Sequence, residues 1–365
     1  MLNNVLFCKK IIFMTKNILL SFWLIISLQI VAFSQNNTDK KNYAVTCIGF
    51  YNLENLFDTI VDPDTTLILQ DEFTPQGKNR WNTSKYYEKL GNMARVISEL
   101  GTEVTPDGAA ILGVSEIENE SVLKDLVKQE AIKDRNYQIV HFDSPDRRGI
   151  DVGLLYNPNY FKNVNAKSYT LKIPTDSNFY TRDQLLVSGE LFGEKIHIIV
   201  AHWPSRRGGE KRSKPKRIAA AQLARAIIDS LQQADPNTKV LYMGDLNDDP
   251  VDVSVRGYLK AVGEKEKTNN GKLFNPFEDF FKKGIGTLGY QDAWNLFDQI
   301  IISEPLLGDD FSSLKYYKSV VYNKNYLKSD SGRFKGYPYR TYSFGEYIGG
   351  YSDHFPVYLY LIKEM

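Results

Sequence analysis

Short apolar runs rich in β-forming residues alternate along the chain with stretches in which apolar side chains recur at helical spacing. The runs predict strands at residues 44–51, 109–114, 137–142, 152–156, 185–192, 195–201, 239–243, 300–302 and 355–362. The helical spacing predicts helices at residues 86–100, 121–130 and 215–233. Ser84 is the expected N-cap of the first helix, and Pro215 is expected to begin the third. Because strands and helices alternate and no linker interrupts residues 43–365, the pattern predicts one domain with α/β layering.

Polar side chains stand at the ends of the predicted strands more often than turn formation alone would explain. They are Asn52, Glu116, His202, Asp245, Asn247 and Asp298 beside strand ends, Asp353 and His354 directly before the last strand, and Asp151 at the start of another. A sheet-based α/β protein gathers such ends along one edge, where its ligands bind. Carboxylate and amide oxygens are the hard ligands that Mg²⁺ or Ca²⁺ prefers, whereas zinc would need more histidine or cysteine.

The stretch KVLYMGDLNDDP at residues 239–250 is the clearest of these strand ends. On an extended backbone side chains alternate, so Asp245 and Asn247 should point to the same side. A plain polar turn is the alternative, since Gly, Asn, Asp and Pro all favour turns. An EF-hand calcium loop is excluded, because its sixth position would be Pro250 rather than glycine and its twelfth would be Arg256 rather than glutamate.

The composition allows a sizeable core, and basic residues are concentrated in one segment of the chain. With 365 residues, 42% of them hydrophobic, the chain can bury one large core or two modest ones. Its formal net charge of +1 excludes the global field that marks a general nucleic-acid binder. Residues 206–217, RRGGEKRSKPKR, depart from this balance, because seven of the twelve are Arg or Lys and only Glu210 is acidic. We expect this segment to be an anion anchor on the rim of the site; a solvated basic loop is the alternative.

The N-terminal segment has the three parts of a secretory signal peptide. Three lysines precede an apolar run at residues 18–33, and Ala32-Phe33-Ser34 forms a small-x-small cleavage site. We therefore expect residues 1–34 to be a signal peptide cleaved near Ser34–Gln35, and the protein to be secreted or periplasmic. Residues 35–42 would be a polar linker and residues 43–365 the functional domain. Met14 is an alternative start, and an uncleaved membrane anchor is the lesser alternative.

Signal cleavage would change both the charge and the cysteine content. Residues 1–34 hold three lysines and no acidic residue, so the net charge would become 1 − 3 = −2. Cys47 would be the only cysteine left, so no intrachain disulfide is expected. No stable membrane anchor would remain after cleavage.

Seven motifs carry a resemblance to a known family. They are FYNLENLFD (50–58), GVSEIEN (113–119), RRGIDVGLLYNP (147–158), AHWPSRRGG (201–209), MGDLNDDP (243–250), FDQIIIS (297–303) and YSDHFPVYL (351–359). In this order they resemble the endonuclease/exonuclease/phosphatase superfamily with the deoxyribonuclease-I-like fold, and the HWPSRRGG form looks most like secreted bacterial members. The resemblance implies an α/β fold, a four-layer sandwich of two packed mixed β-sheets flanked by helices. It also implies a metal-dependent phosphoric ester hydrolase, expected to be a monomer.

The resemblance assigns metal-binding and water-positioning residues one position at a time. Asn52, Glu116 and Asp353 would hold Mg²⁺, with Mn²⁺ or Ca²⁺ as possible replacements, and Glu118 competes with Glu116 for this role. Asp245 would position the attacking water and Asn247 would contact the scissile phosphate, while Asp298 would orient His354 as the partner of that water.

Further residues would bind the phosphate and the leaving group. His202 matches a second histidine of deoxyribonuclease-like and sphingomyelinase-like members, and Asp151 stands where deoxyribonucleases carry the acid that pairs with it. Arg182 would clamp the phosphate, and Arg206 and Arg207 would lie near it. The plain alternatives are a buried structural His354, a turn-capping Asn52, a helix-capping Glu116 and an unliganded Arg182.

The substrate stays open at this point. A phosphoester is implied, and nucleic acid cleaved by an endonuclease or other phosphodiesterase is the leading class. The alternatives are a phosphatase, a lipid phosphodiesterase acting on an inositol phosphate or on sphingomyelin, or a non-catalytic phosphate-binding protein. Loss of a catalytic residue would mark the last class, and none is lost. Family members share this site and differ in their loops, so DNA, RNA and nucleotide are not distinguished.

Overall fold

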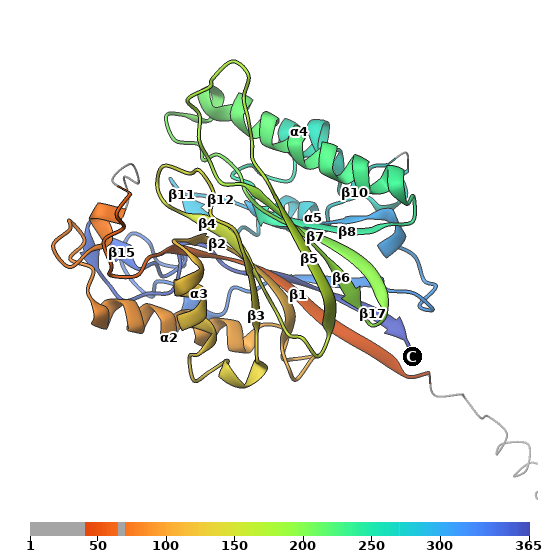
Figure 1. Ribbon diagram of the computed structural model, residues 1–365, viewed down its shortest axis with the longest axis horizontal. Helices are drawn as coiled ribbons and strands as arrows, with labels where there is room; N and C mark the ends of the chain where they lie inside the picture. The colour runs from red at the N-terminus through yellow and green to blue at the C-terminus, as the bar shows by residue number, and fades with distance from the viewer. Residues whose placement is uncertain (1–40, 65–69, 270) are drawn as a thin grey trace, which may run out of the picture. The chain divides into compact units, whose positions relative to one another are not determined.

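Two mixed β-sheets lie face to face in the computed structural model of the chain (Figure 1). The six-stranded sheet has the order β14 (Lys315–Val321), β17 (Val357–Glu364), β1 (Tyr43–Leu56), β2 (Ala109–Ile117), β4 (Asp151–Tyr156) and β3 (Gln138–His141). The seven-stranded sheet has the order β5 (Phe161–Tyr169), β6 (Gln184–Leu191), β7 (Glu194–His202), β8 (Lys239–Asp245), β13 (Asp298–Ser303), β10 (Leu273–Phe274) and β9 (Ala261–Val262). Two small hairpins pair β11 (Leu288–Tyr290) with β12 (Ala293–Asn295), and β15 (Tyr342–Ser343) with β16 (Glu346–Tyr347).

The structure describes residues 41–64, 70–269 and 271–365. The signal peptide expected at residues 1–34 and most of the expected linker therefore lie outside the described residues. Residues 44–364 form one compact unit. Within the described ranges, no helix combines the length and the apolar character that crossing a membrane requires.

Strand alternation separates two hydrophobic clusters. In β8, Leu241 and Met243 belong to the cluster between the sheets, whereas Val240 and Tyr242 belong to the cluster under a helix. The two sheets approach closely at Gly113 of β2, where an added Cβ would lie 2.6 Å from the Met243 sulfur. Glycine is therefore required there for sheet packing.

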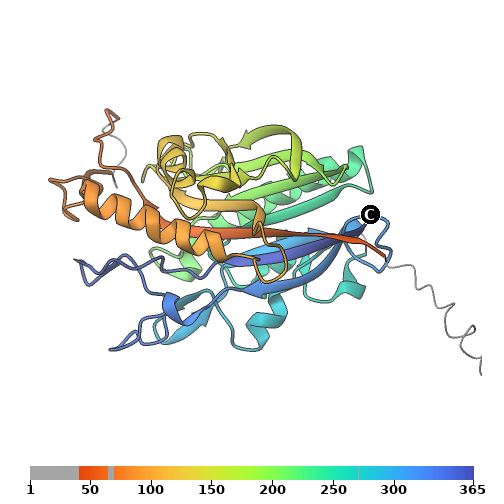
Figure 2. The same ribbon diagram turned by 90° about the horizontal axis from the view of Figure 1, so that it is seen from below.

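Helices cover both outer faces. The α-helices are α2 (Thr83–Glu99), α3 (Glu120–Val127), α4 (Glu210–Ala234) and α5 (Phe277–Lys282). Small side chains of α4, Ala220 and Ala224 among them, pack on the outer face of the seven-stranded sheet. Figure 1 shows α2 and α3 on the opposite side of the two sheets from α4, and Figure 2 shows β1 beside β17. The expected four-layer α/β sandwich is confirmed.

Two local predictions were wrong. Helix α4 begins at Glu210, so Pro215 lies inside its first turns rather than at its start. Gly209 precedes the helix with φ of 106°, and its carbonyl accepts from both the backbone N–H and the hydroxyl of Ser213. Helix α2 is capped by Asn82 rather than Ser84, because the Asn82 side chain accepts a hydrogen bond from the backbone N–H of Lys85. The sequence pattern predicted neither β5 nor β14 as a strand.

Candidate active site

Strand register brings the polar strand ends together. In the seven-stranded sheet, His202 of β7 is paired with Asp245 of β8, and Asp245 is paired with Asp298 of β13. In the six-stranded sheet, Asn52 of β1 is paired with Ser115, which precedes Glu116. The facing sheets then join the two rows, because the Asn52 amide donates to Asp245 Oδ2 at 3.1 Å.

His354 and Asp298 form a buried pair. Nδ1 of His354 lies 2.7 Å from Oδ2 of Asp298. Ser352 fixes the approach of this histidine to β1, since its hydroxyl donates to the Asn52 carbonyl and accepts from the His354 N–H. Burial alone would lower the pKa of His354, but the carboxylates of Asp298 and Asp245 outweigh it and raise that pKa well above its usual value. His354 is therefore held in its protonated form.

Asp245 lies at the centre of the site. Its Oδ2 accepts from Asn52 and lies 3.4 Å from Nε2 of His202 and 3.9 Å from Nε2 of His354. Burial is the main cause that raises the pKa of Asp245 to about 7, against the opposing effect of His354. This carboxylate therefore contacts both histidines expected in the mechanism, and it is a suitable group to position a water molecule.

His202 has the opposite electrostatic environment to His354. Burial, followed by the positive charges of Arg182 and Arg148, lowers the pKa of His202 well below its usual value. Its Nδ1 has no hydrogen-bond partner among the described residues. The site thus places two histidines with oppositely shifted pKa values around a shared carboxylate.

Glu116 offers an oxygen that fits a metal ion. Its Oε2 accepts from the Asn55 N–H at 3.0 Å, while its Oε1 makes no hydrogen bond within the described ranges and lies 3.9 Å from Nε2 of His202. The side chain is 14% exposed, so this free oxygen faces accessible space. A partly exposed carboxylate beside the Asn52 amide supplies the hard oxygen donors that Mg²⁺ accepts.

The backbone at these positions is strained. Glu116 and Asn247 have φ of 58° and 49°, and Glu54 and Asn55 have φ of 46° and 52°. Left-handed backbone is uncommon for residues other than glycine and persists where surrounding contacts enforce it. Here the contacts are side chain to backbone, since the Asn247 N–H donates to Asp245 Oδ1 and the Asn55 N–H donates to Glu116. Strain at several neighbouring positions is typical of a functional site.

Asp353 has a partner that the sequence did not indicate. Its Oδ2 accepts from Arg340 at 2.8 Å, and Arg340 also contacts Glu54 at 3.3 Å. Glu54 is buried, accepts from Thr341 and lies 4.0 Å from Lys89, and burial raises its pKa to about 7. Glu54 belongs to the first motif, where the sequence predicts only a turn residue, whereas Arg340 lies in no motif. Together they place Asp353 at the edge of the site.

The structure does not show the expected pairing of Asp151 with His202. Oδ2 of Asp151 lies 3.0 Å from Nε2 of His141, and Oδ1 accepts from Ser144. Asp151 of β4 lies opposite Ile117 of β2. His141 lies on β3, the other neighbour of β4, so this arrangement brings Asp151 to His141. With Asp143, these two side chains form a possible metal-ligand group, but the mutual hydrogen bond of Asp151 and His141 already satisfies both.

Two of the three arginines expected at the phosphate are engaged elsewhere. Arg182 is buried, donating to Asp146 at 2.9 Å and to the Trp203 carbonyl at 2.5 Å. Arg206 donates to the Asn247 carbonyl, and its guanidinium contacts four carboxylates, those of Asp248, Asp249, Asp252 and Glu210. Both therefore position backbone beside the catalytic groups rather than bind phosphate directly. Arg207 is exposed, and its side chain has no partner among the described residues.

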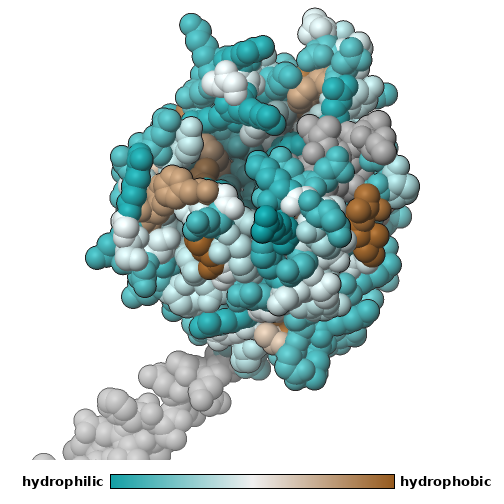
Figure 3. All heavy atoms as spheres, turned by 90° about the vertical axis from the view of Figure 1, so that its left-hand side faces the viewer, coloured by the Kyte–Doolittle hydropathy of each residue, from teal (hydrophilic) through white to brown (hydrophobic). Residues whose placement is uncertain are grey.

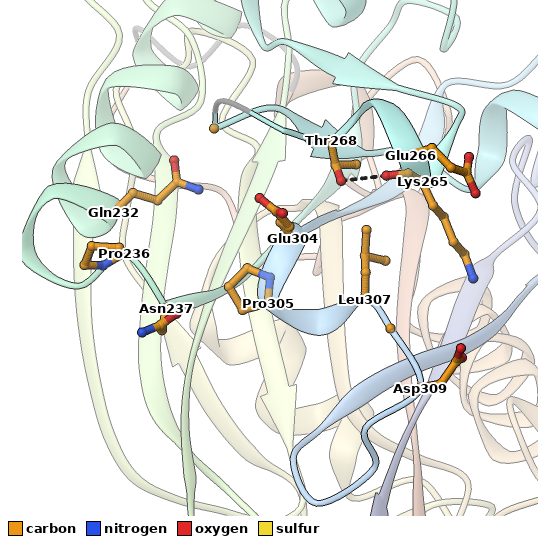
Figure 4. Close-up of a pocket in the computed structure, with 12 residues that line it drawn as sticks. Gln232, Pro236, Asn237, Lys265, Glu266, Thr268, Glu304, Pro305, Leu307 and Asp309 are labelled. Carbon is orange, nitrogen blue, oxygen red and sulfur yellow. Dashed lines mark hydrogen bonds between the residues drawn. The ribbon is translucent and has the colours of Figure 1, made fainter.

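Three cavities differ in their relation to this site. One of about 680 Å³ is lined by Asn247 and Arg207, and another of about 290 Å³ is lined by Asp353 and Arg340. A third, of about 890 Å³, lies beyond the other ends of β8 and β13, where Asn237 and Glu304 line it (Figure 4). It is therefore remote from the chemistry. Figure 3 shows a hollow with hydrophilic walls and a hydrophobic patch beside it on the left-hand face of Figure 1.

The chain matches one family model over nearly all of the described sequence. That model, described as "Endonuclease/Exonuclease/phosphatase family", matches residues 47–363. No curated protein matched the sequence.

Solved structures share the fold at low sequence identity. An endonuclease/exonuclease/phosphatase family protein from Bacteroides thetaiotaomicron is 16% identical, with a TM-score of 0.52 over 89% of this chain and 98% of that one. A mannosyl-6-phosphatase from the same organism is 17% identical, with a TM-score of 0.51 over 87% and 99% of the two chains. D. rerio TDP2 complexed with single strand DNA product is 13% identical, with a TM-score of 0.51 over 87% and 99%. These likenesses concern the fold alone.

Proposed function

The chain belongs to the endonuclease/exonuclease/phosphatase family, and from this premise we propose that it is a divalent-metal-dependent phosphodiesterase that hydrolyses nucleic acid. The observation that carries the proposal is the position of Asp245, whose carboxylate lies between two histidines of opposite electrostatic environment. No candidate residue of the reaction is missing, which argues against a non-catalytic binding protein.

The side chains suit in-line attack by water on a phosphodiester. Asp245 and His354 would orient the water, and Asp298 holds the ring of His354 through Nδ1. His202 and Asn247 would donate to the phosphoryl oxygens. Asp245 would take the proton that the attacking water loses, and His202, whose Nε2 lies 3.4 Å from that carboxylate, would relay a proton to the leaving oxygen. Glu116 and Asn52, with Asp353 nearby, would hold Mg²⁺, Mn²⁺ or Ca²⁺. When bound, such an ion neutralises phosphate oxygens and stabilises the leaving oxygen.

The first test is a substrate panel with purified protein and Mg²⁺. It would contain single- and double-stranded DNA, RNA, bis-p-nitrophenyl phosphate, mannose 6-phosphate, inositol phosphates and sphingomyelin. We expect hydrolysis of the chromogenic diester and of nucleic acid. Hydrolysis of phosphomonoesters alone would make the protein a phosphatase and overturn the proposal.

Metal dependence is a second expectation. Excess EDTA should abolish activity and Mg²⁺ or Mn²⁺ should restore it, because hard oxygen donors dominate the site. Glu116→Gln should raise the Mg²⁺ concentration needed for half-maximal activity by about tenfold or more. Glu118→Gln is the matched control, since Glu118 instead accepts from the Asp58 N–H. Full activity in excess chelator, or an equal effect of both substitutions, would contradict the assignment.

The basic segment gives a third expectation. Arg217 is buried and Arg206 is paired, so Arg207 and Arg212 are the exposed arginines left of residues 206–217. The double variant Arg207→Gln/Arg212→Gln should raise KM for single-stranded DNA. The slope of the logarithm of the binding constant against the logarithm of the salt concentration should also become shallower, by about one for each phosphate that no longer has a cationic partner. The control Lys162→Gln/Lys195→Gln removes two exposed charges at the far end of the seven-stranded sheet. Equal effects of both double variants would show that these arginines make no specific contact.

We also propose that the protein acts outside the cytoplasm, on the basis of the signal-like residues 1–34. The N-terminal sequence of protein recovered from the native organism tests this directly. An N-terminus near Gln35 is expected, and an intact Met1 or Met14 would contradict it.

A further inference from the structure

The cavity beside Asp353 is lined by aromatic side chains and arginines. It has a volume of about 290 Å³ and lies between the β11–β12 hairpin and the segment 329–348. Tyr290, Phe334 and Tyr337 line it together with Arg333 and Arg340. The ring of Tyr337 lies against the hairpin backbone, because a Cβ added at Gly289 would come within 2.6 Å of it. The cavity is thus built on a close packing contact.

A continuous row of aromatic rings connects this cavity to the catalytic histidine. Ring centroids are 5.8 Å apart between Phe334 and Tyr337, 5.5 Å between Tyr337 and Trp294, and 5.9 Å between Trp294 and Phe355. Phe355 directly follows His354 in the chain. A ring bound against Phe334 would therefore be held at a position fixed relative to His354.

Large aromatic surface remains open to solvent at the cavity. Tyr290 is 62% exposed, and Phe344, whose ring centroid lies 5.4 Å from that of Phe334, is 84% exposed. Clustered exposed aromatic side chains in a concave site mark a binding surface for a flat or apolar group.

Unpaired positive charge lies on both sides of the hairpin. Arg333 lines the aromatic cavity, and Arg207 lines the neighbouring cavity that contains Asn247. Neither guanidinium has a hydrogen bond or ion pair within the described part of the chain. Tyr290 and Gln291 line both cavities, so the hairpin separates two cation-bearing subsites. A ligand that fills both would carry repeated negative charge along its length.

We propose that the aromatic cavity binds an unstacked nucleobase next to the scissile phosphate, so that the substrate is single-stranded nucleic acid. This inference rests on the proposed phosphodiesterase function. Bases stack on aromatic side chains without sequence preference, and arginines follow the phosphates of a single strand. Inositol phosphates lack the planar ring, and a sugar monophosphate lacks a second phosphate group. An aromatic cavity with free arginines on either side therefore fits a nucleotide chain best.

Three chromogenic diesters with the same leaving group test this inference. They are the p-nitrophenyl phosphodiesters of thymidine (5′-linked), of abasic 2-deoxyribose (5-linked) and of methanol. We expect kcat/KM for the thymidine ester to exceed that for the abasic ester by about five- to 150-fold, the range that one stacked base contributes. Phe334→Ala and Tyr290→Ala should each lower kcat/KM for the thymidine ester by a much larger factor than kcat/KM for the methyl ester, and so remove much of this preference. Arg333→Gln should weaken inhibition by an oligothymidylate but not by thymidine.

The control is Tyr317→Ala, which removes an exposed tyrosine on β14, outside both cavities. If none of the three esters is hydrolysed, the proposed function itself fails. If all three are hydrolysed but the thymidine and abasic esters react equally, the phosphodiesterase stands and the nucleobase site is overturned. A preference for both sugar esters over the methyl ester, with no effect of the base, would assign the cavity to a sugar ring instead.

Discussion

Replacing His354 by alanine should lower kcat by about two to four orders of magnitude, the usual range for loss of a general acid–base group. Asp298→Asn should cause a loss of similar size. The reason is the buried contact of 2.7 Å between His354 Nδ1 and Asp298 Oδ2, which fixes the ring and stabilises its protonated form. An asparagine can still form a hydrogen bond there, but it removes the charge that raises the pKa of His354.

The double variant distinguishes a shared function from two separate ones. If His354 and Asp298 act as a unit, the double variant should lose little more activity than His354→Ala alone. His197→Ala is a matched control, because His197 also lies on the seven-stranded sheet and bonds a neighbouring side chain, Ser188, but faces away from the site. The measurement is kcat on bis-p-nitrophenyl phosphate. If the loss in the double variant equals the product of the two single losses, the two residues do not work together.

The pattern of apolar residues was sufficient to predict α/β layering because strands and helices each have a local signal, whereas the four-layer sandwich of two sheets came from the family resemblance. Strand alternation distinguishes the two faces of β8, and apolar residues at helical spacing predict the helix α4, although the side chains that pack most closely on the sheet are small ones such as Ala220 and Ala224. Edge strands carry a weaker signal. β5 and β14 are mostly half-buried or exposed, and polar residues interrupt their apolar ones, so neither shows a long apolar run.

The candidate site was predictable as a set of residues but not as a set of contacts. Strand ends of a sheet must meet at an edge, so the strand pattern alone is enough to group Asp245, Asp298 and His202. Which acid pairs with which histidine depends on register. Asp151 on β4 meets His141 on the adjacent strand β3, whereas His202 lies on β7 in the other sheet.

Charge is the feature that the sequence predicted least well. Seven of the twelve residues 206–217 are basic, which is typical of an anion anchor. In the structure, however, some of these side chains are buried and others are exposed. Arg217 is fully buried and Arg206 is surrounded by carboxylates, while Arg207 and Arg212 remain exposed. Helical spacing determines this division, because α4 begins at Glu210 and turns Arg217 inward. The sequence alone could not show where the helix begins, since Pro215 suggested a later start.

The buried Arg217–Asp248 pair leads to a second prediction with a large effect, this time on stability. Nε of Arg217 lies 2.6 Å from Oδ1 of Asp248 in a geometry that makes an ion pair rather than a directed hydrogen bond, and both residues are completely buried. Arg217→Met should lower the free energy of unfolding by about 3–5 kcal/mol, because it leaves a buried carboxylate without its main partner. Urea unfolding followed by fluorescence measures this. Arg206, 3.2 Å from Asp248, compensates in part, so a value near the lower limit is expected.

The matched control lies on the same helix. Arg212→Met removes an exposed guanidinium from α4 and should change the free energy of unfolding by no more than about 0.5 kcal/mol. The double variant Arg217→Met/Asp248→Asn should be destabilised by less than the sum of its two single variants, since the cost of each single change is chiefly the charge that it leaves unpaired. A small loss for Arg217→Met, equal to that of Arg212→Met, would mean that the Arg217–Asp248 pair contributes nothing to stability. Asp248 directly follows Asn247 in the chain. Arg217→Met should therefore also lower kcat at urea concentrations at which the protein is still folded, whereas Arg212→Met should not.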